Sequence, residues 1–235
     1  MAIDASTDRG HVRAIRTDAG SMQLRLMLAL TFSTGIVDAV GFLGLDRVFT
    51  ANMTGNVVIL GMALVGADGL PVMGPLLALL GFMAGAALSG RALRRSSDGW
   101  GSRVTAVLTG VGALCMGLGV ALLVDVDVEL TWVITALLGL AMGMQAAAAR
   151  FLAVKDVTTV VITSTITGLA ADSMLGSGRG GSGARRVWAV LLMLAGAAVG
   201  AALVQWHVAA GVLLTGLLVL VVALVGHLHA RVRFP

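Results

Sequence analysis

The chain has 235 residues, of which 58% are hydrophobic and only 12% are charged, and its mean hydropathy is +0.98. A soluble globular domain carries about twice that share of charged residues, so the composition indicates a polytopic membrane protein. The net charge of +4 does not point to nucleic acid, because the arginines gather at the ends of apolar segments. With one cysteine, Cys115, no internal disulfide forms, and we expect no metal cluster.

Six apolar segments are each long enough to cross a bilayer as a helix, since about 18 apolar residues suffice. In chain order they are 24–45, 71–90, 104–124, 130–149, 187–206 and 208–228. We therefore predict an all-α membrane protein. Its first membrane repeat covers 24–124 and its second covers 130–228. The polar ends, 1–23 and 229–235, are predicted to be cytoplasmic tails, the first of them disordered, because no cleavable signal precedes the first span.

A polar pattern occurs twice within the apolar regions. The positions are Asn52, Thr54 and Asn56 in the first copy and, 111 residues later, Thr163, Thr165 and Thr167 in the second. The apolar segments that follow agree at the same shift, which places Gly85 on Gly196. A membrane protein that repeats a polar, glycine-interrupted stretch commonly binds its substrate between the two halves.

The two segments that carry this pattern, 48–67 and 157–176, either cross the membrane or enter and leave on the same side. Counting both as spans gives eight helices and places the arginine-rich loop 91–103 outside, against the positive-inside rule. With two re-entrant segments, six spans remain, both termini are cytoplasmic and the acidic loop 125–129 is external. We favour this arrangement, in which an odd number of spans per half inverts the second repeat, although full spans remain an alternative.

Each re-entrant segment is expected to begin with extended backbone, at 48–52 and 157–163, where β-branched residues are frequent. Five extended residues reach about 16 Å, roughly half of the hydrocarbon layer. The helix that follows then begins near the midplane, where its free N–H groups must face protein or water. Two such helix N-termini favour an anionic solute, and Gly55 permits its close approach.

Asp38 lies well inside the first apolar segment, where a carboxylate costs several kcal/mol unless it is paired or hydrated. Helical spacing places Thr34 and Asp38 on one face, and Gln145 holds the matching point of the second half. Two interpretations remain open. Asp38 either carries a coupling proton, or it is a buried structural carboxylate bonded to backbone or to Asn52.

Together these patterns predict one binding site for a small solute. Its residues are Asp38, Asn52, Thr54, Gly55, Asn56, Gln145, Thr163, Thr165 and Thr167. We predict no catalytic residue, no metal ligand and no cofactor, because Asp38 has no second carboxylate or histidine at its depth.

Three motifs resemble those of a known family. They are D-A-V-G-F at 38–42, V-F-T-A-N-M-T-G-N at 48–56 and T-I-T-G-L-A-A-D-S at 165–173. With them, the chain resembles the YoaK-like family of bacterial integral membrane proteins, which carry a domain of unknown function. The resemblance covers nearly everything after residue 24. It implies an inner-membrane location and about six helices, and it implies no substrate.

The leading hypothesis is a secondary transporter or permease for a small solute, with the site between the two re-entrant segments. A membrane scaffold without transport activity and an intramembrane enzyme are the alternatives. The expected partners are an unidentified small molecule or ion and the lipid bilayer, and not nucleic acid. A homo-oligomer stays open, because the small-residue strips at Gly85 and Gly196 serve either internal helix packing or a dimer face.

Overall fold

The computed structural model describes residues 5–67, 69–96, 99–124, 127–152, 162–173, 176–178 and 183–233, with side chains from Gly20 to Val232. Within this part of the chain there are eight helices and no strand, so the predicted all-α class is confirmed.

Six of these helices are long and apolar enough to cross a bilayer, α1 through its part Gly20–Gly44. They are α1 (Ala5–Gly44), α3 (Met73–Leu93), α4 (Ser102–Ala121), α5 (Val128–Leu152), α7 (Gly183–Val204) and α8 (Val208–Arg233). The protein is therefore a multi-pass membrane protein. The segment 1–23, which the sequence assigned to a disordered tail, is helical from Ala5 as the first part of α1.

The remaining two helices are short. Helix α2 (Met53–Leu64) has 12 residues and α6 (Ile162–Ala171) has 10. At 1.5 Å per residue these helices reach about 18 and 15 Å, well below the roughly 30 Å of a hydrocarbon layer. The described length of each helix is therefore too short to cross a hydrocarbon layer.

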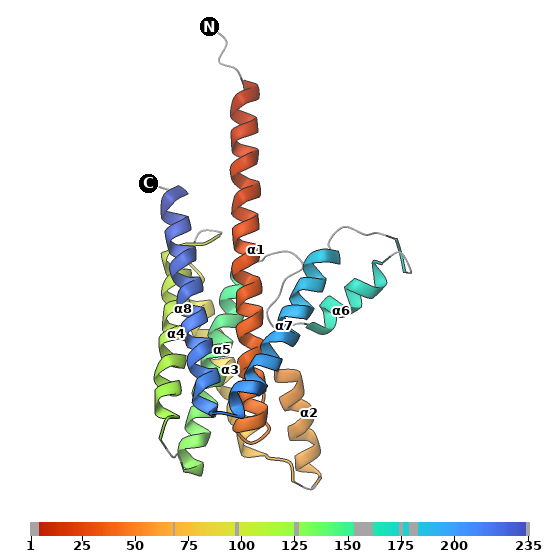
Figure 1. Cartoon of the computed structure of the whole chain (residues 1–235), viewed down its shortest axis with the longest axis vertical. Coiled ribbons are helices and arrows are strands. Elements are labelled where there is room, and N and C mark those ends of the chain that lie inside the picture. The colour runs from red at the N-terminus through yellow and green to blue at the C-terminus, as the bar shows by residue number, and fades with distance from the viewer. Residues whose placement is uncertain are drawn as a thin grey trace.

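Both ends of the chain lie at the same end of the bundle, as an even number of crossings requires (Figure 1). Helix α2 lies toward the opposite end, beside the turn that follows α1. Helix α6 stands at the side of the bundle next to the first half of α7 (Figure 1).

The packing partners of the helices form a reciprocal scheme. Helix α1 packs along α7 and α8, while α5 packs along α3 and α4; α4 and α8 pack on each other. Among the described helices, α2 contacts α3 alone and α6 contacts α7 alone. If each helix of α1–α4 is exchanged with the helix four places later, α1 with α5 and so on to α4 with α8, the same list of packing pairs results.

Glycines allow the closest of these helix contacts. A Cβ atom added to Gly85 on α3 would lie 2.0 Å from the carbonyl oxygen of Leu140 on α5. One added to Gly196 on α7 would lie 2.1 Å from that of Phe32 on α1. No side chain fits at such distances. The internal-packing interpretation of the two small-residue strips is confirmed at these positions.

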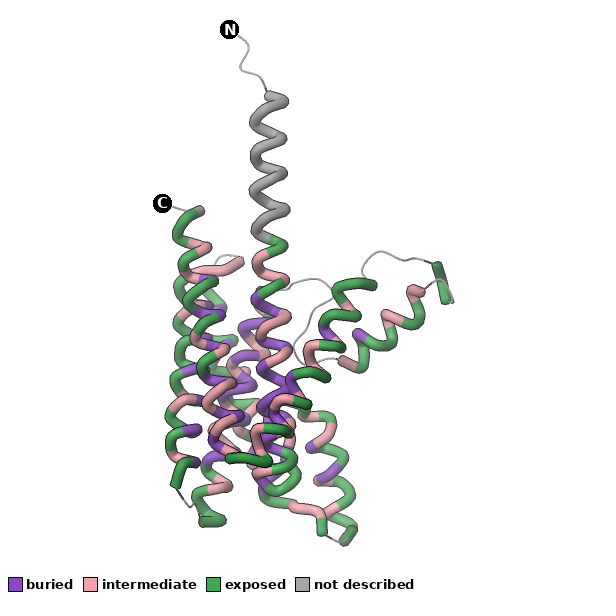
Figure 2. The backbone as a smooth tube through the Cα atoms, viewed as in Figure 1, coloured by how far each residue is buried: buried purple, intermediate pink, exposed green. Residues whose placement is uncertain are grey.

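Burial is concentrated where α1, α5, α4 and α8 meet (Figure 2). In the 18-residue apolar window of α1, 67% of the residues are buried, against 17% in the corresponding window of α7. Helices α1 and α5, which hold equivalent places in the two halves, therefore form the centre of the protein, whereas α7 and the short helices lie at its edge.

Candidate functional site

The chain reverses direction directly after α1. Asp46 and Arg47 both adopt positive φ, 62° and 56°, which is uncommon for residues with a side chain. The backbone N–H of Val48 then donates to the carbonyl oxygen of Gly41, at 3.3 Å. Residues 45–52, here called the return loop, therefore run back along the last turns of α1.

Asp38 holds the return loop against α1. Its Oδ1 accepts hydrogen bonds from the backbone N–H groups of Thr50 (2.9 Å) and Ala51 (2.7 Å), and from the Thr50 hydroxyl at 3.4 Å. The side chain is 5% exposed. Asp38 lies six residues before the end of α1 at Gly44, which is about 9 Å along the helix axis. The carboxylate thus fixes the start of α2 about 9 Å inward from the end of α1.

Asn56 holds the same loop from the other side. Its Oδ1 accepts from the backbone N–H of Phe49 at 2.9 Å, and its Nδ2 donates to the Phe49 carbonyl oxygen. Asn52 is the N-cap of α2, with Oδ1 accepting from the N–H of Gly55 at 3.4 Å. A Cβ at Gly55 would lie 2.6 Å from the Phe49 ring, so glycine makes room for this ring. Thr54 is exposed.

Gln145 on α5 meets α1 one turn before Asp38. Its Nε2 donates to Thr34 Oγ1 at 3.1 Å, and that hydroxyl donates to the Leu30 carbonyl oxygen at 2.8 Å. The amide oxygen Oε1 of Gln145 is buried and has no hydrogen-bond partner. Thr34 and Asp38 share one helix face, and Gln145 contacts that face at Thr34. These three side chains are here called the polar seam.

The second copy of the polar pattern lies on α6. Thr165 is buried, and Thr163 and Thr167 are exposed. Helix α6 does not contact α2, so the described residues do not bring the two copies into direct contact. Of the extended backbone expected at 157–163, residues 157–161 lie outside the described residues. Ile162 and Thr163 are helical instead, as the first residues of α6.

Arg186 at the start of α7 holds α6. Its Nη1 donates to the Gly168 carbonyl oxygen at 2.7 Å and to Asp172 Oδ2 at 2.6 Å. From the sequence, Arg186 was expected only to be one of the cations of a loop. The glycine of the second motif was the available signal, because a Cβ at Gly168 would lie 2.9 Å from the guanidinium carbon.

The described residues contain no group of three or more His, Cys, Asp or Glu side chains that lie close enough to hold a metal ion. A shallow, mostly apolar hollow of about 470 Å³ lies between α3 and α5, with Leu77, Glu129 and Trp132 in its wall. Its lining includes none of the polar residues of the seam or the return loop.

Comparison with known proteins gives a family without an assigned activity. The model of the family described as "Protein of unknown function (DUF1275)" matches residues 26–225. The UPF0700 transmembrane protein YoaK of Bacillus subtilis (strain 168) is 32% identical over 155 residues, which are 66% of this chain and 68% of that protein. No solved structure matches the chain.

Proposed function

We propose that this chain, which belongs to the DUF1275 family of proteins of unknown function, is a permease that carries a small solute across the bacterial cytoplasmic membrane. The observation that carries the proposal is the reciprocal packing of its two halves, α1–α4 and α5–α8. Transporters built from two inverted halves bind their substrate near the midplane, where broken helices begin.

Inversion of the second half is supported by the number of spans. Each half contains three long helices and one short one in the same order. Because three crossings bring the chain to the opposite side, the second half starts from the other face of the membrane. Helices α2 and α6 then enter the bilayer from opposite sides.

The re-entrant path of the first short segment is supported by one hydrogen bond between its two ends. Arg47 Nη1, before α2, donates to the carbonyl oxygen of Gly69, after α2, at 3.2 Å. The start and the end of the excursion therefore lie at the same end of the bundle. Between them the chain rises to the level of Asp38, where Asp38 and Asn56 satisfy the backbone polar groups that lipid would leave unpaired.

The site residues divide into two roles in this proposal. Asp38, Gly55 and Asn56 position the return loop, since their contacts are made with its backbone and with Phe49. Asn52 and Thr54 are exposed at the N-terminus of α2, where the partial positive charge of the helix end favours an anionic or strongly dipolar solute. Thr163 is exposed at the corresponding end of α6, and Thr167 is exposed in the middle of that helix.

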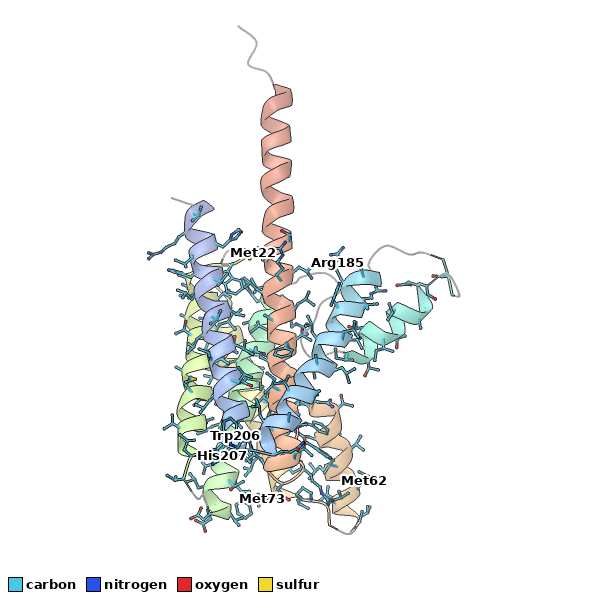
Figure 3. The ribbon with its side chains drawn as sticks, viewed as in Figure 1. Met22, Met62, Met73, Arg185, Trp206 and His207 are labelled. Atoms are coloured by element: carbon cyan, nitrogen blue, oxygen red, sulfur yellow. The ribbon has the colours of Figure 1, made fainter. Side chains whose placement is uncertain are left out.

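The orientation is supported by the distribution of charge. Figure 3 places Arg185 and Met22 at one end of the bundle and Trp206, His207, Met62 and Met73 at the other. The end with Arg185 also carries the chain termini (Figure 1), so the positive-inside rule assigns both termini to the cytoplasm.

Flux measurements on the purified protein in liposomes test the proposal. Thr54→Val keeps the size of the side chain and removes only its hydroxyl, so it should reduce solute flux without lowering stability. Thr109→Val, at an exposed position of α4, is the matched control and should leave flux unchanged. A protein that carries no member of a broad panel of anions and small polar solutes would overturn the permease.

One observation favours a membrane scaffold as the second candidate. Asp38 and Asn56 bind the backbone of the return loop, and Asn56 also contacts Met53, as expected of side chains that stabilise a fold. A scaffold would lose stability in variants at these residues and would show no flux in liposomes.

A further inference from the structure

The polar seam contains a buried acceptor without a donor, Oε1 of Gln145, and the two helices that carry the seam, α1 and α5, are central to the fold. We infer that Asp38 and Gln145 together bind a monovalent cation, a proton or Na⁺, whose binding is coupled to movement of the return loop. This inference rests on the proposed permease function, for which it names the coupling ion site.

Gln145 supplies the first unpaired acceptor. Its side chain is 1% exposed, its amide nitrogen is occupied by Thr34, and its Oε1 has no partner. Leaving a buried acceptor unpaired costs about 1–3 kcal/mol, so an oxygen in this state at the centre of a membrane protein points to a bound group that supplies positive charge or a donor.

Asp38 supplies the second acceptor. Its three short hydrogen bonds all end on Oδ1, and the backbone N–H of Asn52 also lies close to the carboxylate. None of the three short bonds uses Oδ2, which we assign to the cation. Asp38 lies one helical turn from Thr34, and side chains so placed have Cβ atoms about 5–6 Å apart. Because Gln145 is bonded to Thr34 itself, we infer that one small ion, or a proton with a water molecule, bridges the two acceptors.

No cationic side chain of the described residues neutralises Asp38. It is the only ionisable side chain among the buried polar residues of the described chain. The helices packed on α1 carry no charged residue over 189–204 of α7 or 208–226 of α8, and α5 carries Glu129 and Arg150 only near its ends.

The charged and titratable residues near the C-terminal end of α1, the end closest to Asp38, are exposed. Asp46, Arg47 and His207 are all exposed, and Arg47 donates to Gly69 instead of Asp38. A carboxylate without a counter-ion at membrane depth is costly. A bound cation removes this cost.

Either ion satisfies both acceptors. A proton taken from water forms an O–H bond on Oδ2, and this O–H group can donate to Gln145 Oε1. Na⁺ instead takes one oxygen from each side chain as a ligand, as hard cations do. In both cases the negative charge on Asp38 is neutralised. Its hydrogen bonds to Thr50 and Ala51 weaken, because bonds to a charged acceptor are the stronger ones. Cation binding is thus transmitted to the loop that sets the start of α2.

The Na⁺ arm of the test is a binding measurement that needs no solute. The apparent unfolding temperature of the protein in lipid nanodiscs is followed as Na⁺ replaces choline, since a ligand that binds only the folded form stabilises it. Gln145→Leu should weaken Na⁺ binding by about 10- to 100-fold, and Asp38→Asn should abolish it. Thr215→Val, which removes another buried hydroxyl without a partner, is the control and should bind Na⁺ normally.

The proton arm uses infrared difference spectra between alkaline and acidic buffer. The wild-type protein should show the carbonyl band of a protonated, hydrogen-bonded carboxylic acid that is missing in Asp38→Asn. Gln145→Leu should keep this band and move it to higher frequency, because the acid has lost its acceptor. Should Asp38→Asn fail to fold, the shift in Gln145→Leu still decides the question.

The outcomes separate the inference from the permease itself. Stabilisation by Na⁺ assigns Na⁺, and the shifted carboxyl band assigns the proton. If neither signal appears, or if both persist unchanged in Gln145→Leu, the cation site is overturned. Cation binding without solute flux supports the site and removes the permease. Solute flux with no cation signal overturns the site and leaves the permease in place.

Discussion

Asn56 satisfies both backbone polar groups of Phe49, accepting its N–H at 2.9 Å and donating to its carbonyl oxygen. One side chain at the start of α2 thus pairs with both backbone polar groups of a return-loop residue, as a neighbouring strand does in a sheet. Together with Asp38 it allows non-helical backbone to lie inside the membrane-spanning part of the bundle.

The two asparagines of the first polar motif should differ in their contribution to stability. Asn56→Ala leaves the N–H and the carbonyl of Phe49 without partners, and each loss costs about 1–3 kcal/mol when buried. Asn52→Ala removes an exposed N-cap, which costs about 1 kcal/mol. Unfolding in mixed micelles, followed by tryptophan fluorescence, measures both. Equal losses in the two variants would show that the Phe49 contact is not needed.

Substitution of Asp38 should destabilise the protein through the backbone of the return loop. Asp38→Ala leaves the N–H groups of Thr50 and Ala51 without an acceptor, and a hydrogen bond to a charged group is worth about 1.5–3 kcal/mol. Asp38→Asn keeps an acceptor and should lose less. Thr50→Val removes only the 3.4 Å hydroxyl contact and should lose least. Any other order of the three unfolding midpoints contradicts the assigned role of Asp38.

Two glycines of α3 provide a matched pair. Gly85→Ala places a Cβ 2.0 Å from the Leu140 carbonyl oxygen, and forcing the helices apart should cost about 1–3 kcal/mol. At Gly90 nothing lies within 4 Å of an added Cβ, so Gly90→Ala should stabilise the helix by about 0.5–1 kcal/mol. Thermal unfolding in detergent compares them, and a stable Gly85→Ala protein would mean that α3 and α5 are not in close contact.

The attachment of α6 to α7 should depend on Arg186. Arg186→Gln removes the ion pair with Asp172 and weakens the bond to the Gly168 carbonyl oxygen. Amide hydrogen exchange in α6 should then become faster, while exchange in α2 should not change. Arg185→Gln, an exposed neighbour, serves as the control. Unchanged exchange in α6 for Arg186→Gln would show that apolar contacts alone hold this helix.

The proposed orientation can be tested by labelling cysteines in whole cells. In a Cys115→Ala background, a cysteine at Asp127 should react with an impermeant maleimide from outside, because the acidic loop is external. A cysteine at Ser177 should react only after the membrane is permeabilised. The opposite labelling pattern would invert the topology, and labelling of both positions in intact cells would contradict six spans.

Much of the fold was predictable from local sequence. Six long apolar helices were expected, and six of the eight described helices are long and apolar enough to cross a bilayer, because this property depends on the run of residues itself and not on its neighbours. The contacts of Gly85 and Gly196 were also expected, since small residues at regular spacing allow helices to approach. The first half of the site was partly predicted: Asp38 bonded to backbone was one of the two interpretations that the sequence left open.

Other parts of the site could not be predicted, for a physical reason. Asp38 and Asn56 bond mainly to backbone groups, which nearly every residue has. The type of a residue therefore does not indicate that it is their partner. Arg186 is separated from Gly168 by 18 residues and from Asp172 by 14. The linear sequence does not show that these residues meet in space.

By itself, the sequence determined which segments are long and apolar enough to cross a membrane and which polar groups lie within apolar stretches, because both depend on the composition of short segments. The tertiary structure alone decided what those polar groups do. The reversal after α1 brings Thr50 and Ala51 to Asp38, and the crossing of α1 and α5 leaves Gln145 with an unpaired oxygen. Hydrogen bonding depends on distance and direction in space, and only the folded chain sets these.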